Sequence, residues 1–341
     1  MPDAPSPAPF LGQVTDDHEY VDRFVLSFKD LPGTGRRVPL TCFNTWMGQT
    51  REKSIHPIAA GIRGLFTTGA GVAAVTRGTK LRLYDEAALG DILEVRCRAF
   101  QNDDGSRCDG EFTWLAIGAD GSQRLLATGC METAFVRLIG FGVGQSAPAP
   151  DFWRLFFAEH SCGMPGPQPT PPPGVGLYTR VPRTTPLFRR EVPQTKPFLC
   201  ERTFETGQQD SNLVGNLYFA HYALWQERLA EAWFFRHLPG LYRDPREHRE
   251  LVCVALEVRH IREAMPFDSI RLRMHLLALE TNLLSLHFDA FRVESTGALT
   301  KLAVGRCDYV LVERSGAADP RFLALPSEIL SVLTPLMEET H

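Results

Sequence analysis

The second half of this chain repeats the first half, and this internal repeat limits the possible folds more than any single motif. The segment LRLYDEAALGDILEVRC aligns with LEVRHIREAMPFDSIRLRM, LLATGCMETAFV with KLAVGRCDYVLV, and TWMGQTRE with LWQERLAE. The blocks keep their order and nearly the same offset, as three matched pairs illustrate: Trp46 with Trp225, Glu86 with Glu263, and Ala127 with Ala303. A nearly constant offset over three blocks predicts two copies of one structural unit.

Each unit reads as a strand, a long helix and then several strands. In the second half, FLCERTFET is a short strand, and Asp210, Ser211 and Asn212 are typical turn and cap residues. A helix is predicted from apolar residues at three- or four-residue steps: Leu217, Tyr222, Trp225, Leu229, Ala232 and Phe235. Four runs that alternate apolar and charged residues follow, the last two joined by the hairpin turn TGAL.

One long helix wrapped by an antiparallel sheet is the hot-dog architecture, so the expected fold is α+β, a double hot-dog. A single unit would leave a sheet edge unpaired, and fusion of two units lets the sheets join edge to edge in a pseudo-dimer. The expected division is a loose tail at 1–15, an N-terminal unit at 16–140, a Pro-rich linker at 141–197 and a C-terminal unit at 198–341. The aromatic residues at 152–157 indicate that the first part of the linker packs on a unit. A homodimer of the whole chain remains an open alternative.

Charge and cysteine usage exclude several classes of function. The 36 basic and 40 acidic side chains give a net charge of −4, which argues against nucleic acid and anionic membranes as partners. The eight cysteines are scattered singly without a CxxC pair, so no metal site is expected. The sequence shows neither a leader peptide nor a membrane span, and we expect a cytoplasmic protein without a bound cofactor.

The segment DSNLVGNLYFAHYALWQE, at 210–227, resembles the start of the central helix in hot-dog thioesterases, most closely those of enediyne polyketide pathways. The two-unit layout also resembles the bifunctional acyltransferase/decarboxylases of the leinamycin type. The resemblance implies an enzyme that acts on an acyl thioester of coenzyme A or an acyl carrier protein in polyketide biosynthesis. Thioester hydrolysis is the favoured reaction. Acyl transfer with decarboxylation, hot-dog dehydration and non-catalytic acyl binding stay open as alternatives.

The predicted helix start also has chemical potential of its own. The first N–H groups of a helix lack intrahelical acceptors, and Gly215 would let a thioester carbonyl approach the backbone closely. We therefore expect the amides around Gly215, Asn216 and Leu217 to form an oxyanion hole. The simpler alternative is that Gly215 only ends a turn. Tyr218 and His221 follow on the same helix and are candidate substrate contacts.

Asn212 stands where many hot-dog thioesterases have an aspartate that acts as base or nucleophile. An amide can do neither at neutral pH, but it can orient a water molecule or a thioester oxygen. On this view, replacing Asn212 by Asp should leave hydrolysis unchanged or raise it. The alternative is that Asn212 is only a helix cap.

Charged residues on the two central helices complete the candidate set. TWMGQTRE places Arg51 and Glu52 in a W-x-G-x-x-R-E pattern that resembles the enediyne enzymes, whereas the second half has Ala230 and Glu231 there. In the first half the turn GTGRR brings Arg36 and Arg37, which could contact a pantetheine phosphate. We expect one working site, at the second helix, with Arg51 supplied by the first unit and Glu231 as a further catalytic candidate.

Overall fold

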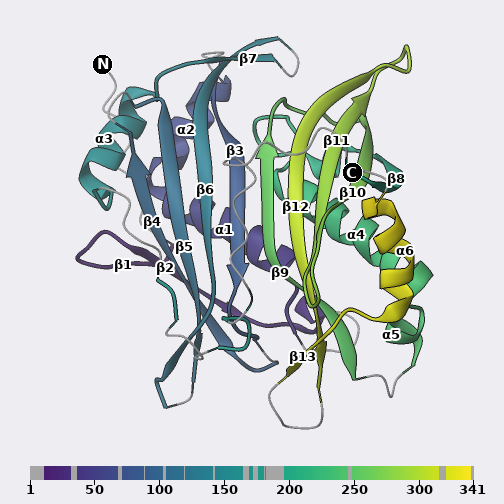
Figure 1. The fold of residues 1–341 in the computed structure, drawn as a ribbon. Coiled ribbons are helices and arrows are strands. Elements are labelled where there is room, and N and C mark those ends of the chain that lie inside the picture. Colours follow the sequence, from purple (N-terminus) through teal and green to yellow (C-terminus); the bar gives the residue numbers. More distant parts are fainter. Residues whose placement is uncertain are drawn as a thin grey trace, which may run out of the picture.

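A computed structural model describes residues 11–31, 37–67, 71–87, 89–102, 105–118, 120–140, 143–163, 169–171, 176–179, 181, 196–244, 248–314 and 320–338. Its strands form one continuous antiparallel sheet that curves around two long helices (Figure 1). The predicted architecture, two helix-and-sheet units joined edge to edge, is confirmed.

The first half contributes seven strands and three α-helices to the described part of the chain. Its strands are β1 (Gln13–Val14), β2 (Tyr20–Val25), β3 (Val72–Leu83), β4 (Ile92–Gln101), β5 (Arg107–Ile117), β6 (Gln123–Gly140) and β7 (Val143–Ser146). Its helices are α1 (Leu40–Ser54), α2 (Ala59–Thr67) and α3 (Asp151–His160).

The second half has the same order of a strand, a long helix and a meander. Its strands are β8 (Phe198–Glu205), β9 (Arg249–His260), β10 (Ser269–Leu279), β11 (Leu284–Val293), β12 (Leu299–Glu313) and β13 (Arg321–Leu323). Its helices are α4 (Ala220–His237), α5 (Gly240–Arg243) and α6 (Ser327–Glu338). The predicted hairpin joins β11 to β12, and Gly297 adopts the positive φ of +80° that its turn requires.

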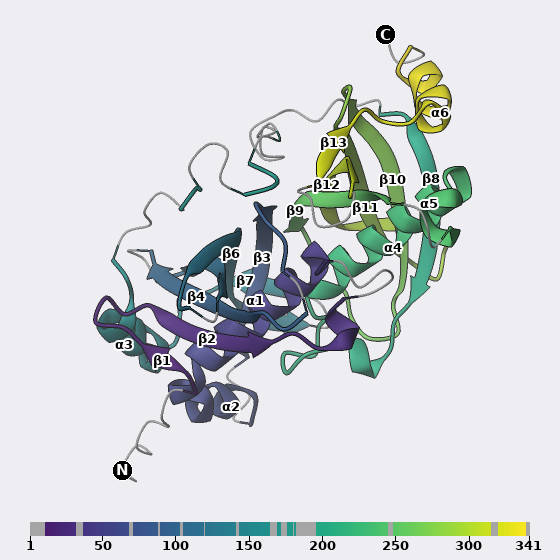
Figure 2. The same ribbon diagram turned by 90° about the horizontal axis from the view of Figure 1, so that it is seen from below.

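The two half-sheets meet at β3 and β9, which pair antiparallel from Gly78 with Arg259 to Arg82 with Ala255. The order across the sheet is β1-β2-β4-β5-β6-β3-β9-β12-β11-β10-β8. Helices α1 and α4 lie side by side on the concave face, where their apolar sides form the main core (Figure 2). The inner edge of each unit is buried against the other, and β1 and β8 lie at the two ends of this order.

Residues matched in the sequence repeat occupy equivalent places. Gly129 pairs with Leu81 and Phe112, and Gly305 pairs in the same way with Val258 and Phe288. The tryptophans of the two central helices also correspond. Trp46 stacks on Phe24 with ring centroids 5.6 Å apart, and Trp225 stacks on Phe204 at 5.5 Å. The two halves matched in the sequence therefore have equivalent three-dimensional arrangements.

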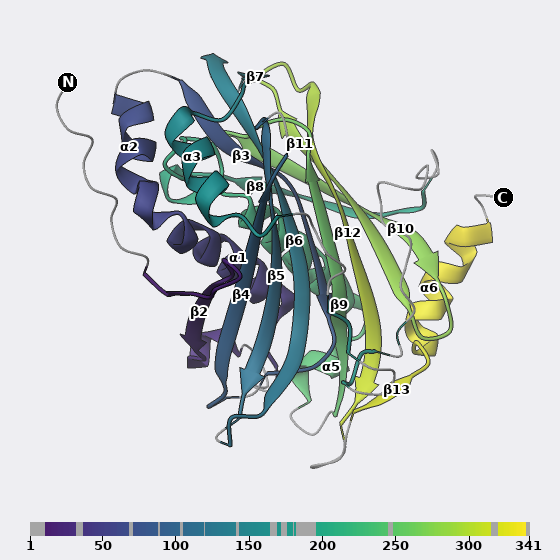
Figure 3. The same ribbon diagram turned by 90° about the vertical axis from the view of Figure 1, so that its left-hand side faces the viewer.

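Two elements lie outside the simple two-unit pattern. Helix α3 forms within the Pro-rich connecting segment, and its buried Trp153, Phe156 and Phe157 pack on the first half beside α2, as the aromatic cluster indicates (Figure 3). The sequence gives no prediction of α6, because Pro335 interrupts its pattern. Ile329 and Leu333 are buried, so α6 packs through one apolar stripe. Among the described residues, no helix combines the length and the apolar character needed to cross a membrane.

Candidate active site

A cavity of about 690 Å³ lies where the loop before α4 meets the first half. Its volume falls within the range of about 300 to 1,000 Å³ that is typical of small-molecule sites. One wall consists of Gln209, residues 211–214, Tyr218 and His221, and the others come from α1, α2, α3 and the concave face of β3 to β6. The cavity is thus composite, because neither half alone encloses it.

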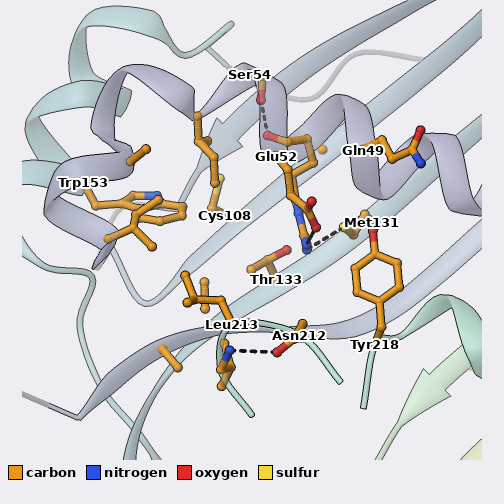
Figure 4. A pocket seen from close by; sticks show the side chains of 18 of the residues that line it. Gln49, Glu52, Ser54, Cys108, Met131, Thr133, Trp153, Asn212, Leu213 and Tyr218 are labelled. Carbon is orange, nitrogen blue, oxygen red and sulfur yellow. Dashed lines mark hydrogen bonds and ion pairs between the residues drawn. The ribbon is translucent and has the colours of Figure 1, made fainter. Parts of the chain in front are cut away.

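The two sides of the cavity differ in chemistry (Figure 4). Tyr218 and Gln49 lie on one side with Asn212 and Leu213 below, whereas Trp153 and Cys108 lie on the other side. The Trp153 side is mainly apolar, with Phe135 and Phe157 in the same wall. A substrate with a polar reactive group and an apolar chain would fit this division.

Asn212 is held in a turn that fixes the orientation of its amide. Its Oδ1 accepts a hydrogen bond from the Val214 N–H at 2.8 Å, and its own backbone N–H donates to the Asn216 carbonyl at 3.1 Å. This is an Asx turn and not the helix cap of the alternative interpretation, since α4 begins only at Ala220. With Oδ1 already engaged, Asn212 has its NH₂ group left to donate to a ligand.

The amides expected to form the oxyanion hole are largely engaged within the protein. The Gly215 N–H donates to the Asn212 carbonyl at 2.9 Å, and the Leu217 N–H donates to the Ala264 carbonyl at 2.8 Å. Gly215 has a φ of +88°, and a Cβ at this position would meet open space. Glycine therefore suits this turn, because other residues rarely adopt a positive φ.

Asn216 faces away from the cavity. It is 7 % exposed and its Nδ2 donates to the Glu263 carboxylate, which lies at the end of β9. Burial raises the pKa of Glu263 while this hydrogen bond opposes the shift. Gly215, Asn216 and Leu217 are not among the described residues that line the cavity. Together they anchor the loop that carries Asn212.

Tyr218 crosses from the second half to the first. It packs where Gly48 of α1 leaves space, since a Cβ on Gly48 would lie 2.0 Å from the Tyr218 hydroxyl. Burial raises the pKa of the Tyr218 phenol well above its usual value, and a hydrogen bond to the Glu52 side chain adds to this shift. Tyr218 is therefore a protonated hydrogen-bonding group in the cavity wall.

Arg51 brings a positive charge to the same wall. Its guanidinium donates to the Thr76 hydroxyl at 3.0 Å and to the Met131 sulfur at 3.2 Å, and it lies 5.6 Å from the centroid of the Phe219 ring. Glu52 is 3.4 Å away at its other nitrogen. Glu52 offsets part of the positive charge, whereas the sulfur and hydroxyl partners do not, so Arg51 can still bind a developing negative charge.

The imidazole of His221 lies close to the carboxylate of Asp210. Its Nε2 lies 3.7 Å from Oδ1 of Asp210, while Oδ2 of Asp210 accepts the Gly207 N–H at 2.7 Å. Burial lowers the pKa of His221 below its ordinary value, and the Asp210 charge opposes this shift. The ring also stacks on Trp225 at 5.8 Å. His221 is thus a neutral imidazole at pH 7 in the cavity wall, able to accept a proton.

The remaining candidates lie elsewhere. Arg37 is buried at the start of α1, where it binds Glu250 at 2.7 Å and the Leu251 carbonyl at 3.1 Å. Glu231 lies on α4 near Glu227, and desolvation together with the Glu227 charge raises its pKa to about 7. Neither residue is among those that line the cavity, and Arg36 lies outside the described residues. The cavity thus brings together Asn212, Tyr218, His221 and Arg51 but not Arg37 or Glu231.

Sequence reasoning missed the side of the cavity formed by the connecting segment. Trp153 and Phe157 come from α3, and Thr133 comes from β6. The aromatic run at 152–157 indicates packing, but a cavity between α3 and the sheet leaves no local signature in the sequence. This side of the cavity can be recognised only from the three-dimensional structure.

The comparisons with known proteins agree with this architecture. Over 86 % of the chain, the structure matches the 12:0-ACP thioesterase from Umbellularia californica (97 % of that chain, TM-score 0.61, 11 % identity). It also matches an acyl-ACP thioesterase from Bacteroides thetaiotaomicron over 86 % of this chain and 98 % of that one, with a TM-score of 0.54 and 13 % identity. The chain has the double hot-dog fold.

A further match spans less of this double hot-dog protein. The dynemicin thioesterase aligns with 40 % of this chain and 95 % of its own length, at 30 % identity and a TM-score of 0.37. No protein-family profile and no curated protein matches the sequence.

Proposed function

We propose that this double hot-dog protein hydrolyses acyl thioesters in the composite cavity, with the acyl group delivered by an acyl carrier protein or coenzyme A. The observation that carries the proposal is the meeting of His221 and Asn212 from the second half with Arg51 from the first, around a cavity large enough for an acyl chain. The similarity in fold to acyl-ACP thioesterases supports it.

His221 is the proposed general base. Its imidazole is neutral at pH 7 because burial lowers its pKa, and Asp210 would stabilise the imidazolium that forms during the reaction. A water oxygen adds to the thioester carbonyl carbon while His221 takes the water proton. The tetrahedral intermediate then collapses, the C–S bond breaks, and His221 returns the proton to the leaving thiolate.

Arg51 and Asn212 are the proposed partners of the oxyanion. The Arg51 guanidinium donates to the neutral Thr76 and Met131 through one nitrogen and pairs with the half-exposed Glu52 through the other. The hydrogen bond from Val214 to Oδ1 fixes the orientation of the Asn212 amide, whose NH₂ would donate to the oxyanion. A positioned donor of this kind contributes about 3 kcal/mol to stabilising the transition state. In this mechanism, side chains and not the backbone amides around Gly215 donate hydrogen bonds to the oxyanion.

Water is favoured over a side-chain nucleophile. Cys97 and Cys108 line the cavity, but burial raises the pKa of both thiols far above neutrality. The Tyr218 phenol is likewise held protonated. A protonated thiol or phenol is a poor nucleophile, so transfer through an acyl-enzyme is less favoured than hydrolysis.

A polyketide acyl chain is the finer part of the proposal. It rests on the segment at 210–227, whose sequence resembles the enediyne-pathway thioesterases. The apolar wall from α2 and α3 would hold such a chain.

Incubation of the protein with acyl-CoA and acyl-carrier-protein panels tests the proposal. Free thiol is measured colorimetrically, and the products are identified by mass spectrometry. The expected result is free acid together with the unloaded carrier. Acylated carrier or protein without free acid would favour acyl transfer, and unchanged thioesters with tight binding would indicate a non-catalytic acyl-binding protein.

A further inference from the structure

The apolar part of the cavity borders small side chains on the concave face of the first half of the sheet. Four of these residues line the cavity: Ala74 of β3, Ala99 of β4, Gly110 of β5 and Thr133 of β6. Their strands are hydrogen-bonded neighbours, and Ala99 is paired directly with Gly110. The four residues therefore form one region of small groups beneath the cavity.

The second half has large side chains at the equivalent places. Its strands pair in the same register, so the place of Ala99 beside Gly110 is taken by Leu276 beside Leu286. The counterparts of Ala74, Ala99, Gly110 and Thr133 are, in this order, Leu251, Leu276, Leu286 and Tyr309. All four counterparts are buried in the main core.

The ends of the two central helices differ in the same direction. When the tryptophans of α1 and α4 are aligned, Ser54 and Ile55 correspond to Trp233 and Phe234. Phe234 packs edge to face on Tyr309, with the ring centroids 5.0 Å apart. Ser54 and Ile55 instead line the cavity. Large aromatic side chains thus fill, in the second half, the space that belongs to the cavity in the first.

The difference between the halves is not a requirement of the fold, because the second half accepts large residues at these places. A cavity in a protein interior costs stability in rough proportion to its volume. Small residues at several neighbouring places therefore favour a binding site for an apolar ligand. Figure 4 shows Thr133 between Tyr218 and Trp153, so a chain that extends from the polar side toward Trp153 would pass over this region.

We propose that the acyl chain lies along the concave face of the first half, and that the small size of Ala74, Ala99 and Thr133 sets the greatest chain length that the protein accepts. The inference rests on the proposed function for the identity of the ligand as an acyl group. It adds three specificity-determining residues to that function. It also limits the protein to one chain per molecule, since large residues occupy the equivalent places of the second half.

Saturated fatty acids test the proposal by binding alone, without hydrolysis. The acids from hexanoic to octadecanoic acid are titrated into the full chain by calorimetry. Each added methylene should raise the affinity about fourfold until the chain reaches the end of the cavity, and the affinity should then stop rising. One acid should bind per protein molecule. Affinity that does not depend on chain length, binding of two acids, or no binding of any acid would overturn the proposal.

A matched pair of variants assigns the length limit to the first half. Ala99→Leu introduces the side chain that the second half has at this place, and its three additional carbon atoms should shorten the longest well-bound acid by about three carbons. Leu276→Ala makes the reverse change in the main core, so it should lower the melting temperature and leave the limit unchanged. An unchanged limit in Ala99→Leu, or a changed one in Leu276→Ala, would contradict the proposal.

A second variant and a measurement on the unmodified protein cover the case in which Ala99→Leu fails to fold. Ala74→Leu should shorten the limit in the same way. In the unmodified protein with ¹³C-labelled alanine and threonine methyl groups, the terminal methyl of the longest well-bound acid should show nuclear Overhauser contacts with Ala74, Ala99 or Thr133. Contacts with none of these three methyl groups would overturn the proposal.

Failure of this inference and failure of the proposed function can be told apart. If the protein is not a thioesterase, acyl thioesters stay intact while the length limit and its change in Ala99→Leu remain. If the inference about the chain is wrong, thioesters are cleaved but Ala99→Leu and Ala74→Leu keep the limit of the unmodified protein.

Discussion

The starts of α1 and α4 are equivalent positions in the internal repeat. The polar side chains at these two positions have different surroundings. Before α4, Gly48 leaves space for Tyr218, and His221 borders a cavity. At the start of α1, the residue equivalent to Gly48 is Glu227, which accepts a hydrogen bond from Thr41 at 2.6 Å. The start of α4, which borders the cavity, is therefore called the open position. The start of α1, where Glu227 occupies the equivalent space, is called the filled position.

A buried ion-pair cluster extends the filled position. Arg37 binds Glu250, which also lies 3.4 Å from Arg314, and Arg314 pairs with Glu86. Tyr178 of the connecting segment donates its hydroxyl to Glu86. These ion pairs link residues of both halves, so they serve to hold the halves together. Duplication thus allows one helix start to border a cavity with polar side chains while the equivalent start becomes part of the contact between the halves.

Removal of the proposed base should have the largest effect. His221→Gln keeps a polar side chain but cannot take a proton, so kcat should fall by about 100- to 10,000-fold. In the unmodified protein, kcat should fall as the pH decreases through the pKa of His221, which lies below 6.5, because the imidazole then becomes charged. His221→Gln should remove this acid limb. Steady-state rates between pH 4 and 8 measure both effects.

Cys42 is the residue equivalent to His221 at the other position, and it provides the matched control. Cys42→Ser should leave kcat and the pH profile unchanged. A loss of activity in Cys42→Ser as large as in His221→Gln would mean that both positions are used.

Disruption of the filled position should affect stability and not turnover. Arg37→Ala leaves Glu250 buried without its closest partner, and loss of one member of a buried ion pair costs about 3 to 5 kcal/mol. Urea denaturation should show this loss in the free energy of unfolding, while kcat per folded molecule stays constant. The equivalent variant, Asn216→Ala, breaks a hydrogen bond from a neutral amide and should cost less. A large loss of kcat in Arg37→Ala would assign function to the filled position.

Sequence periodicity could predict the elements because they depend on local patterns. The strands from β8 to β12 and the helix α4 follow from alternation and from three- and four-residue spacing. The sequence pattern predicts too early a start for α4, since the turn held by Asn212 and Gly215 comes first and the helix begins only at Ala220. Cap-forming residues signal a turn and a helix start alike.

The candidate site can be predicted only in part, because its residues come from both halves and meet only where the two halves pack together. The motif pointed to Asn212, and the repeat pointed to Arg51 through the change to Ala230. The partners that decide their roles, Val214 for Asn212 and Met131 for Arg51, depend on tertiary contacts. Glu231 is equivalent to Glu52 in the repeat. It lies near Glu227, at the filled position, and not among the described residues that line the cavity.

Loss of the positive charge of Arg51 should have the next largest effect. Arg51→Ala should lower kcat/KM by about 100-fold, because the oxyanion loses a charged donor. The melting temperature should also fall slightly, since the contacts with Thr76 and Met131 are lost. Glu231→Gln, on the other central helix, should leave kcat/KM unchanged. Equal losses in the two variants would contradict the division into open and filled positions.

The smallest effect, and the sharpest test of the open position, is expected for Asn212→Asp. A carboxylate keeps the acceptor for the Val214 N–H, so the turn and the melting temperature should persist. The sequence alone predicts unchanged or faster hydrolysis, because a base is restored. The geometry predicts about a tenfold decrease in kcat, because a donor to the oxyanion is replaced by a negative charge.

The pH profile of Asn212→Asp separates these two outcomes. A new carboxylate in the cavity wall would favour the charged form of His221, raise the pKa of that imidazole and move the acid limb of kcat to higher pH. If the aspartate served as the base, the limb would instead move down toward the ordinary carboxyl pKa of about 4 and kcat would rise. A rise in kcat with a limb near that pH would transfer the base from His221 to position 212, and a fall with an upward shift would leave it at His221.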